Sequence, residues 1–181
     1  MKDERLWRYS RLTRMWARSM IVASLLVLAL AFALEASAGE GIGGGWLLVF
    51  GGVAVGTLVV CTPLARLAVA GPSSRLPEAE PNSGPRRLEP TPSEWRRWSL
   101  LSAGVLVAGA TAMLLFLVAI LDRGGTAEGV VVGLLAAWGI ATFVDAHQIE
   151  RTEEAEGRRY YAAVRSPIAV GRHLVWERHA A

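Results

Sequence analysis

Two acidic residues, Glu35 and Asp145, lie at the ends of long uncharged stretches, where a carboxyl group could bind a proton or an ion. An ionisable group inside the hydrocarbon of a membrane is costly, and by default it indicates a functional site. Asp145 follows Glu128 by about 25 Å along a helix that rises about 1.5 Å per residue, which places it near a headgroup layer where an arginine can pair with it. Glu35 is the stronger candidate, because a span over residues 19–39 would include it. The alternative is that Glu35 ends its helix at headgroup level.

Metal and catalytic chemistry have no sequence support. His147 lies two residues from Asp145, about 200° around a helix, so the two side chains cannot hold one metal from the same face. His173 and His179 show no zinc spacing, and Cys61, the only cysteine, excludes an intrachain disulfide. The sequence contains no Gly-x-Ser-x-Gly, no phosphate-binding loop and no His-Glu-x-x-His. It therefore predicts a non-enzymatic protein without a metal or a cofactor.

Four uncharged runs predict four transmembrane helices. Residues 41–65 and 99–121 contain no Asp, Glu, Lys or Arg over 25 and 23 residues, and a bilayer core of about 30 Å needs about 20 helical residues. Residues 19–34 and 129–144 are two further uncharged runs of 16 residues. Flanking residues complete these spans if long charged side chains reach back to the membrane surface. The expected fold is an all-α polytopic membrane protein, a four-helix bundle made of two antiparallel hairpins.

The basic residues indicate the orientation of the bundle. Of the 19 Lys and Arg residues, six precede the first span, six separate the second span from the third, and six follow the fourth; only Arg123 falls elsewhere. Cytoplasmic loops collect Lys and Arg, so we expect a multi-pass protein of the bacterial cytoplasmic (inner) membrane with both termini in the cytoplasm. This placement explains the basic residues without a nucleic-acid partner. The large excess of Arg over Lys is typical of coding in a high-GC bacterial genome.

The N-terminus allows a second interpretation. Basic residues, an apolar run and then Ala36-Ser37-Ala38 also describe a secretory signal with a cleavage site. Cleavage before Gly39 would leave three spans. The long basic segment and the position of Glu35 favour a retained first span instead.

The chain divides into five predicted segments: a basic cytoplasmic segment (1–18), a first transmembrane hairpin (19–70), a Pro-rich cytoplasmic linker (71–92), a second hairpin (93–148), and a cytoplasmic C-terminal helix and tail (149–181). The linker contains six prolines, which predicts a disordered or extended chain. Thr91-Pro92-Ser93-Glu94 has the form of a capping box that begins the third span. Beyond the fourth span a helix is expected to continue past Gly157, a weak interruption, as far as Ser166-Pro167.

Small residues spaced four apart predict where the helices pack. In lipid, close approach of small residues and interhelical hydrogen bonds replace the hydrophobic effect as the cause of helix association. The third and fourth spans are expected to meet along two such ridges, and the second span carries a shorter one. The residues are Gly52 and Gly56 in the second span, Gly104, Ala108 and Ala112 in the third, and Gly129, Gly133, Ala137 and Ala141 in the fourth.

The second span ends in Thr62-Pro63-Leu64-Ala65-Arg66, followed by a break and a charged, aromatic entry to the third span. Over about residues 15–120 this order resembles a family of small, uncharacterised bacterial integral membrane proteins, in which T-P-x-x-R likewise closes the second span. The chain departs from that pattern in its long Pro-rich linker and its fourth span with a tail. The resemblance implies a membrane protein and no particular activity.

Two functions are compatible with these features. The first is a non-enzymatic accessory or scaffold subunit, embedded in the lipid bilayer, whose cytoplasmic segments meet a protein partner. The second is a small transporter or channel, built as a homo-oligomer, that uses Glu35 or Asp145. Few polar groups lie at membrane depth and the cytoplasmic segments are long, so the sequence favours the first.

Overall fold

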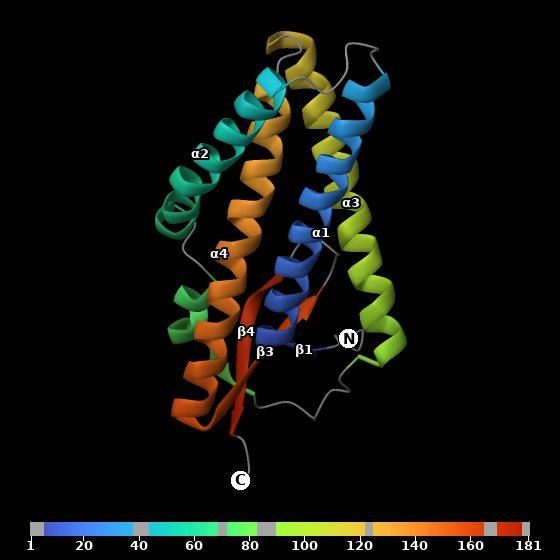
Figure 1. Cartoon of the computed structure of the whole chain (residues 1–181). Helices are drawn as coiled ribbons and strands as arrows, with labels where there is room; N and C mark the ends of the chain where they lie inside the picture. The colour runs from blue at the N-terminus through green and yellow to red at the C-terminus, as the bar shows by residue number, and fades with distance from the viewer. Residues whose placement is uncertain are drawn as a thin grey trace.

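The computed structural model of the chain describes residues 6–37, 44–68, 72–82, 90–121, 125–164 and 170–178. Four long helices dominate it, and a small β-sheet lies at one end of the bundle, here called the sheet end (Figure 1). The helices are α1 (Tyr9–Ser37), α2 (Gly44–Ala68), α3 (Pro92–Leu121) and α4 (Thr126–Glu156).

All four helices are long and apolar enough to cross a membrane, as the four predicted spans require. Their outward faces form an apolar belt, because large apolar side chains are exposed on every one of them. On α4 this belt ends near Phe143, and the exposed residues that follow, His147 and Gln148, are polar. α1 and α4 both continue beyond the belt into the sheet end (Figure 1).

α4 is the helix against which the others are arranged. It runs antiparallel to α1 and parallel to α2, which lie on different sides of it (Figure 1). α3 packs mainly beside α1, where the Ser19 and Ser102 hydroxyls form a hydrogen bond of 2.9 Å. The packing therefore differs from two self-contained hairpins: in the described residues α1 packs mainly on α4 and α3, and it meets α2 where Phe32 contacts Trp46 and Phe50.

Two of the predicted small residues sit at a tight helix contact, but the partner is α2 rather than α3. A Cβ atom added to Gly129 would lie 2.9 Å from the Phe50 carbonyl oxygen, and one added to Gly133 would lie 2.7 Å from the Ala54 carbonyl oxygen. Gly139, which the four-residue spacing did not include, packs against α1 at Ile21. The glycines thus let the backbones of α2 and α4 touch.

The expected ridge on α3 and the short ridge on α2 do not pack within the bundle, so the prediction of an α3–α4 seam was wrong. A Cβ atom added to Gly52, Gly56 or Gly104 would meet nothing within 4 Å. Ala108 and Ala112 are likewise exposed. Four-residue spacing selects one helix face but cannot say which neighbour that face meets.

The sheet corrects the expectation of an all-α fold. Its strands are β1 (Leu6–Arg8), β2 (Glu80–Pro81), β3 (Arg158–Val164) and β4 (Val170–Arg178). Their order is β1-β3-β4-β2, with β3 antiparallel to both β1 and β4, and β2 parallel to β4. The chain reaches the sheet from its N-terminal segment, its linker and its C-terminal segment.

The predicted C-terminal helix stops early. Gly157 caps α4 in the left-handed conformation (φ 60°) and donates a backbone hydrogen bond to the Glu153 carbonyl, so the helix ends there rather than near Ser166. Glycine takes this conformation at little cost. After Gly157 the burial of side chains alternates from one residue to the next. Tyr160 and Ala162 are buried, whereas Arg159 and Tyr161 are only half-buried, as in a strand with one covered face.

Part of the predicted linker is also ordered. A 3₁₀ helix, η1 (Pro72–Glu78), packs against α4 and buries Leu76, and the backbone N–H of Asn82 donates to the Trp176 carbonyl at 3.0 Å. Residues 83–89 lie outside the described part. The capping box at the start of α3 is present, since the Thr91 N–H donates to Glu94 at 2.9 Å and the Glu94 N–H donates back to the Thr91 hydroxyl at 3.4 Å.

An apolar core joins the sheet to the helices. Side chains from the sheet, η1 and the lower turns of α1 and α4 form one cluster, and Trp7 lies at its centre with Trp95 and Trp98 of α3 edge-on against it, at centroid distances of 4.4 and 5.5 Å. The buried members are Trp7, Tyr9, Leu12, Met15, Leu76, Ile149, Tyr160, Ala162 and Leu174.

Replacing Gly133 with Ala should loosen the contact between α2 and α4. The added methyl group meets backbone and the branched Thr57 side chain, so a helix must move, and overpacking of this kind costs about 1–3 kcal/mol. Thermal unfolding in detergent should show a lower midpoint for Gly133→Ala. Gly52→Ala is the matched control and should leave the midpoint unchanged or slightly raise it; equal effects of the two substitutions would contradict the packing.

Candidate functional site

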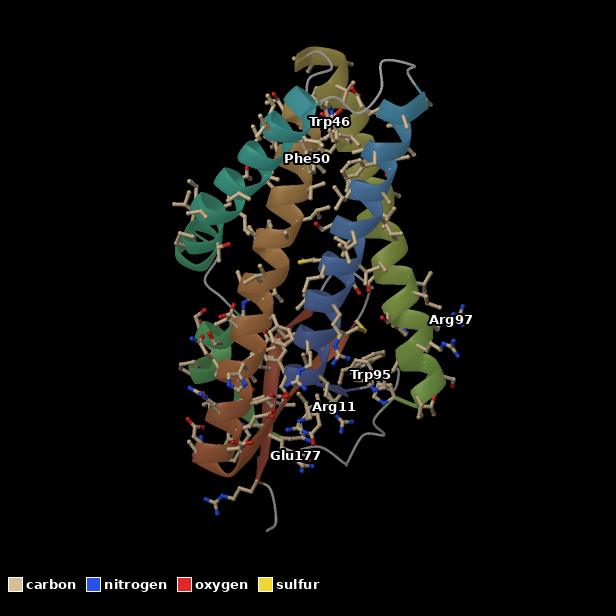
Figure 2. The ribbon with its side chains drawn as sticks, viewed as in Figure 1. Arg11, Trp46, Phe50, Trp95, Arg97 and Glu177 are labelled. Carbon is tan, nitrogen blue, oxygen red and sulfur yellow. The ribbon has the colours of Figure 1, made fainter. Side chains whose placement is uncertain are left out.

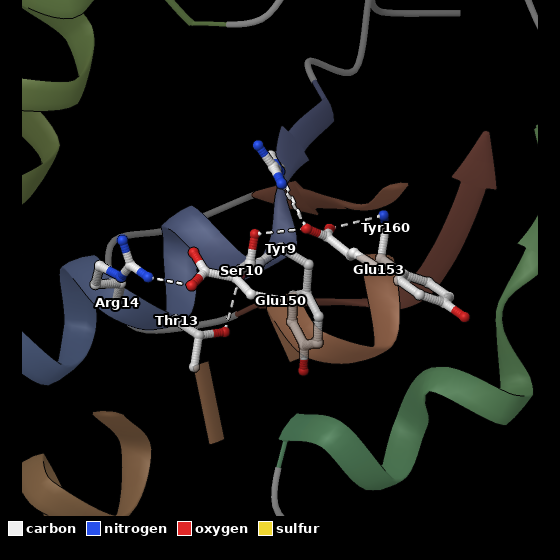
Figure 3. A network of polar contacts seen from close by, with 8 residues as sticks. Tyr9, Ser10, Thr13, Arg14, Glu150, Glu153 and Tyr160 are labelled. Atoms are coloured by element: carbon white, nitrogen blue, oxygen red, sulfur yellow. Dashed lines mark hydrogen bonds and ion pairs between the residues drawn. The ribbon is translucent and has the colours of Figure 1, made fainter. Parts of the chain in front are cut away.

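Glu153 lies at the junction of α1, α4 and the sheet, and it is only 4% exposed (Figure 3). Its Oε2 accepts hydrogen bonds from Arg8 Nη2 at 2.7 Å, Arg8 Nε at 3.2 Å and the Ser10 hydroxyl at 3.1 Å. Its Oε1 accepts a hydrogen bond from the backbone N–H of Tyr160 at 3.1 Å. One carboxylate of α4 thus holds β1, the start of α1 and β3.

The charges of this junction are matched. Burial alone would lower the pKa of the Arg8 guanidinium, but the hydrogen bond and negative charge of Glu153 outweigh burial, and the pKa is raised. One turn further along α1, Arg14 pairs with Glu150 of α4 (Figure 3). One ion pair therefore links β1 to α4, and the other links α1 to α4, where the helices leave the apolar belt.

A second set of contacts ties the end of α4 to β3, and β3 to β4. The Tyr160 hydroxyl donates to Glu156 at 2.6 Å, and the Arg158 guanidinium lies 4.2 Å above the Trp176 ring. Burial, with the bond to Glu156, raises the pKa of Tyr160 to about 12. A raised pKa stabilises the fold below the ordinary tyrosine value of about 10, and that stabilisation is lost as the pH rises through the folded value.

Glu153 is suited to holding the fold together rather than to catalysis. Both of its oxygens already accept hydrogen bonds from the protein, and its charge is compensated by Arg8. Across the described segments, no group of three or more His, Cys, Asp and Glu side chains is placed to hold a metal ion.

Asp145 lies where the exposed residues of α4 change from apolar to polar. It is buried, and the Ser73 hydroxyl of η1 donates a hydrogen bond to its Oδ1 at 3.3 Å. Ser73 lies in the segment predicted to be the linker, so a linker residue contacts Asp145. His147 is exposed, so the structure does not bring it to the same face as Asp145.

Two of the described acids, Glu35 and Glu128, lie at the other end of the bundle. Glu35 is half-buried near the end of α1. Glu128, in the first turn of α4, is buried, and its Oε2 has no hydrogen-bond partner within the described residues. The indole N–H of Trp46 on α2 is likewise buried without an acceptor there.

The sequence interpretation missed Glu128 and Glu153. Glu153 could have been predicted from the sequence, because it continues the four-residue series that begins at Gly129 and passes through Asp145. Every member of that series is buried. Four residues turn a helix by about 400°, so the series shifts by about 40° at each step. It faces α2 at Gly129 and reaches α1 and the sheet at Glu153. Glu128 gave no such signal, since an acid in a first helical turn is ordinary.

A scan against protein-family models finds no matching family, and searches of curated proteins and of solved structures find no similar protein. The resemblance carried by Thr62-Pro63-Leu64-Ala65-Arg66 therefore stays a prediction.

Replacing Glu153 with Gln should destabilise the protein strongly. The amide nitrogen cannot accept the bonds that the carboxylate accepts, and it leaves Arg8 without its counter-charge. Breaking a buried ion pair on one side costs about 3–5 kcal/mol, and we expect the lower part of that range because Arg8 is 22% exposed.

The measurement is unfolding in detergent, followed by circular dichroism. Glu154→Gln is the matched control, since Glu154 is exposed on the same turn. Equal stability of the two variants would show that Glu153 does not hold the junction.

Proposed function

We propose that the protein is an accessory or scaffold subunit of the bacterial cytoplasmic membrane, with its sheet end in the cytoplasm bound to a protein partner. The orientation rests on the basic residues, which gather in the segments that meet at the sheet end. A periplasmic reporter enzyme fused to the C-terminus is therefore expected to be inactive.

The observation that carries this proposal is the sheet fixed on two membrane helices. α1 and α4 continue from the apolar belt into the sheet end. Glu153 and the apolar core around Trp7 attach the sheet to these two helices. Such an arrangement holds one surface at a set height and angle above the bilayer. Positioning a partner needs a rigid mount of this kind, and catalysis by itself does not.

The surface offered to a partner is the outward face of β3 and β4. Tyr160 and Ala162 point into the core, so their neighbours Arg159 and Tyr161 point outward. Arg159 lies opposite Glu177 and Tyr161 opposite Val175 in the antiparallel register. All four are half-buried, and together they form a mixed charged and aromatic patch, of the composition that recognises another protein.

A homo-oligomeric transporter or channel is the second candidate. Its support is the small residues Gly52, Gly56, Gly104, Ala108 and Ala112, which face outward on α2 and α3 and would allow close packing of a second copy. Asp145 supports it less, because that acid receives a hydrogen bond from η1 at the edge of the apolar belt.

A photo-crosslinking amino acid at Tyr161 should trap a different protein in native membranes. Leu115 is the control position, because it is exposed in the apolar belt of α3, where adducts with lipid are expected. Immunoblotting and mass spectrometry of the adducts would identify what each position touches. Adducts only between copies of this chain would favour the oligomer, and no protein adduct at Tyr161 would contradict the scaffold.

A further inference from the structure

Glu128 has one buried carboxylate oxygen, Oε2, without a hydrogen-bond partner among the residues that the structure describes. The residue as a whole is 7% exposed. Glu153 is as deeply buried, but four donors surround it. The described residues therefore supply no hydrogen-bond donor to the Oε2 of Glu128.

The residues that follow Glu128 on α4 pack against apolar and aromatic side chains. The next residue, Gly129, packs directly on the backbone of Phe50 in α2. Val131 and Val132, one turn further on, belong to one cluster with Trp46 and Phe50. The Trp46 and Phe50 rings stack at 5.0 Å at this end of the bundle (Figure 2).

Glu128 also lies at the depth of the apolar belt. Its neighbour Gly129 is level with Phe50, and the α2 residues just before Phe50, from Leu47 to Val49, are exposed apolar side chains. The acid is thus at a height where the outside of the bundle is apolar, close to the end opposite the sheet.

An unpaired carboxylate is costly in such a place. The cost of removing an ion from water remains large even after relaxation, and the dipole of α4 returns only a small part of it to an acid in its first turn. α1 contributes Glu35, a second acid, to this end; the described parts of α2 and α3 contribute no charged residue here. Protonation removes the charge and turns the carboxyl group into a hydrogen-bond donor.

We propose that Glu128 is a proton-binding site inside the membrane, near the end of the bundle opposite the sheet. The bound species is a proton, taken up by the carboxylate to give an uncharged carboxylic acid. The site is independent of the partner surface on β3 and β4, so either proposal can fail without the other.

Infrared difference spectroscopy of the full chain in lipid tests this directly. The wild-type protein should show the carbonyl stretching band of a protonated carboxylic acid, shifted in heavy water. Glu128→Gln should lose that band, and Glu35→Gln should keep it. A band that persists in Glu128→Gln, or that is absent from the wild type, would overturn the proposal.

A second measurement protects the test if Glu128→Gln does not fold. A hydrophobic carbodiimide reacts with protonated carboxyl groups in apolar surroundings, and peptide mass mapping locates the adduct on the unmodified protein. The adduct is expected on the peptide that contains Glu128. Its absence there, with labelling of any other acid, would show that Glu128 is ionised and serves only as an acid at the start of a helix.

Discussion

The carboxylate of Glu153 is the contact on which the arrangement of this protein depends. It gathers the end of β1, the first turn of α1 and the start of β3 around one turn of α4. These segments come from opposite ends of the chain, so bringing them together costs loop-closure entropy that local contacts cannot repay. The Glu153 carboxylate accepts hydrogen bonds from several donors, and together with the apolar core around Trp7 it is a contact strong enough to fix these segments. The strands β1 and β2, which have three and two residues, would not form a sheet alone.

α4 links the two ends of the molecule through one continuous row of buried residues. The row starts with Gly129 and Gly133, which allow α2 to touch the backbone, and it ends with Ile149 and Glu153 in the core of the sheet end. Because the row winds around the helix, α4 faces different neighbours along its length, and it packs on both α1 and α2. The small residues therefore pack against α2, and the acids at the other end of the row bind α1, η1 and the sheet.

The membrane helices could be predicted because the absence of charge over about 20 residues is a local property of the sequence. The capping box at Thr91 was predictable for the same reason. The sheet was not, since its two edge strands are very short and its register is set between distant segments. The sequence indicated Gly157 as a weak interruption of the helix, but only the structure shows that this glycine takes the left-handed conformation and ends the helix. Of the acids, Glu153 could have been found by continuing the four-residue series, whereas Glu128 could not, because the burial of its Oε2 away from every donor in the described segments depends on the tertiary structure.

The protein is best understood as a bundle of apolar helices that carries a small β-sheet at one end. The buried acids at the two ends of the bundle have different surroundings. At the sheet end Glu150 and Glu153 are paired with arginines and stabilise the fold; at the other end the Oε2 of Glu128 has no hydrogen-bond partner among the described residues. Amide hydrogen exchange in lipid nanodiscs tests the central claim most directly, because it reports whether the C-terminal segment is part of the folded unit. We predict that the amides of β3 and β4 exchange as slowly as those of the last turns of α4. Exchange of β3 and β4 at the rate of an unstructured peptide, beside a protected α4, would contradict the account.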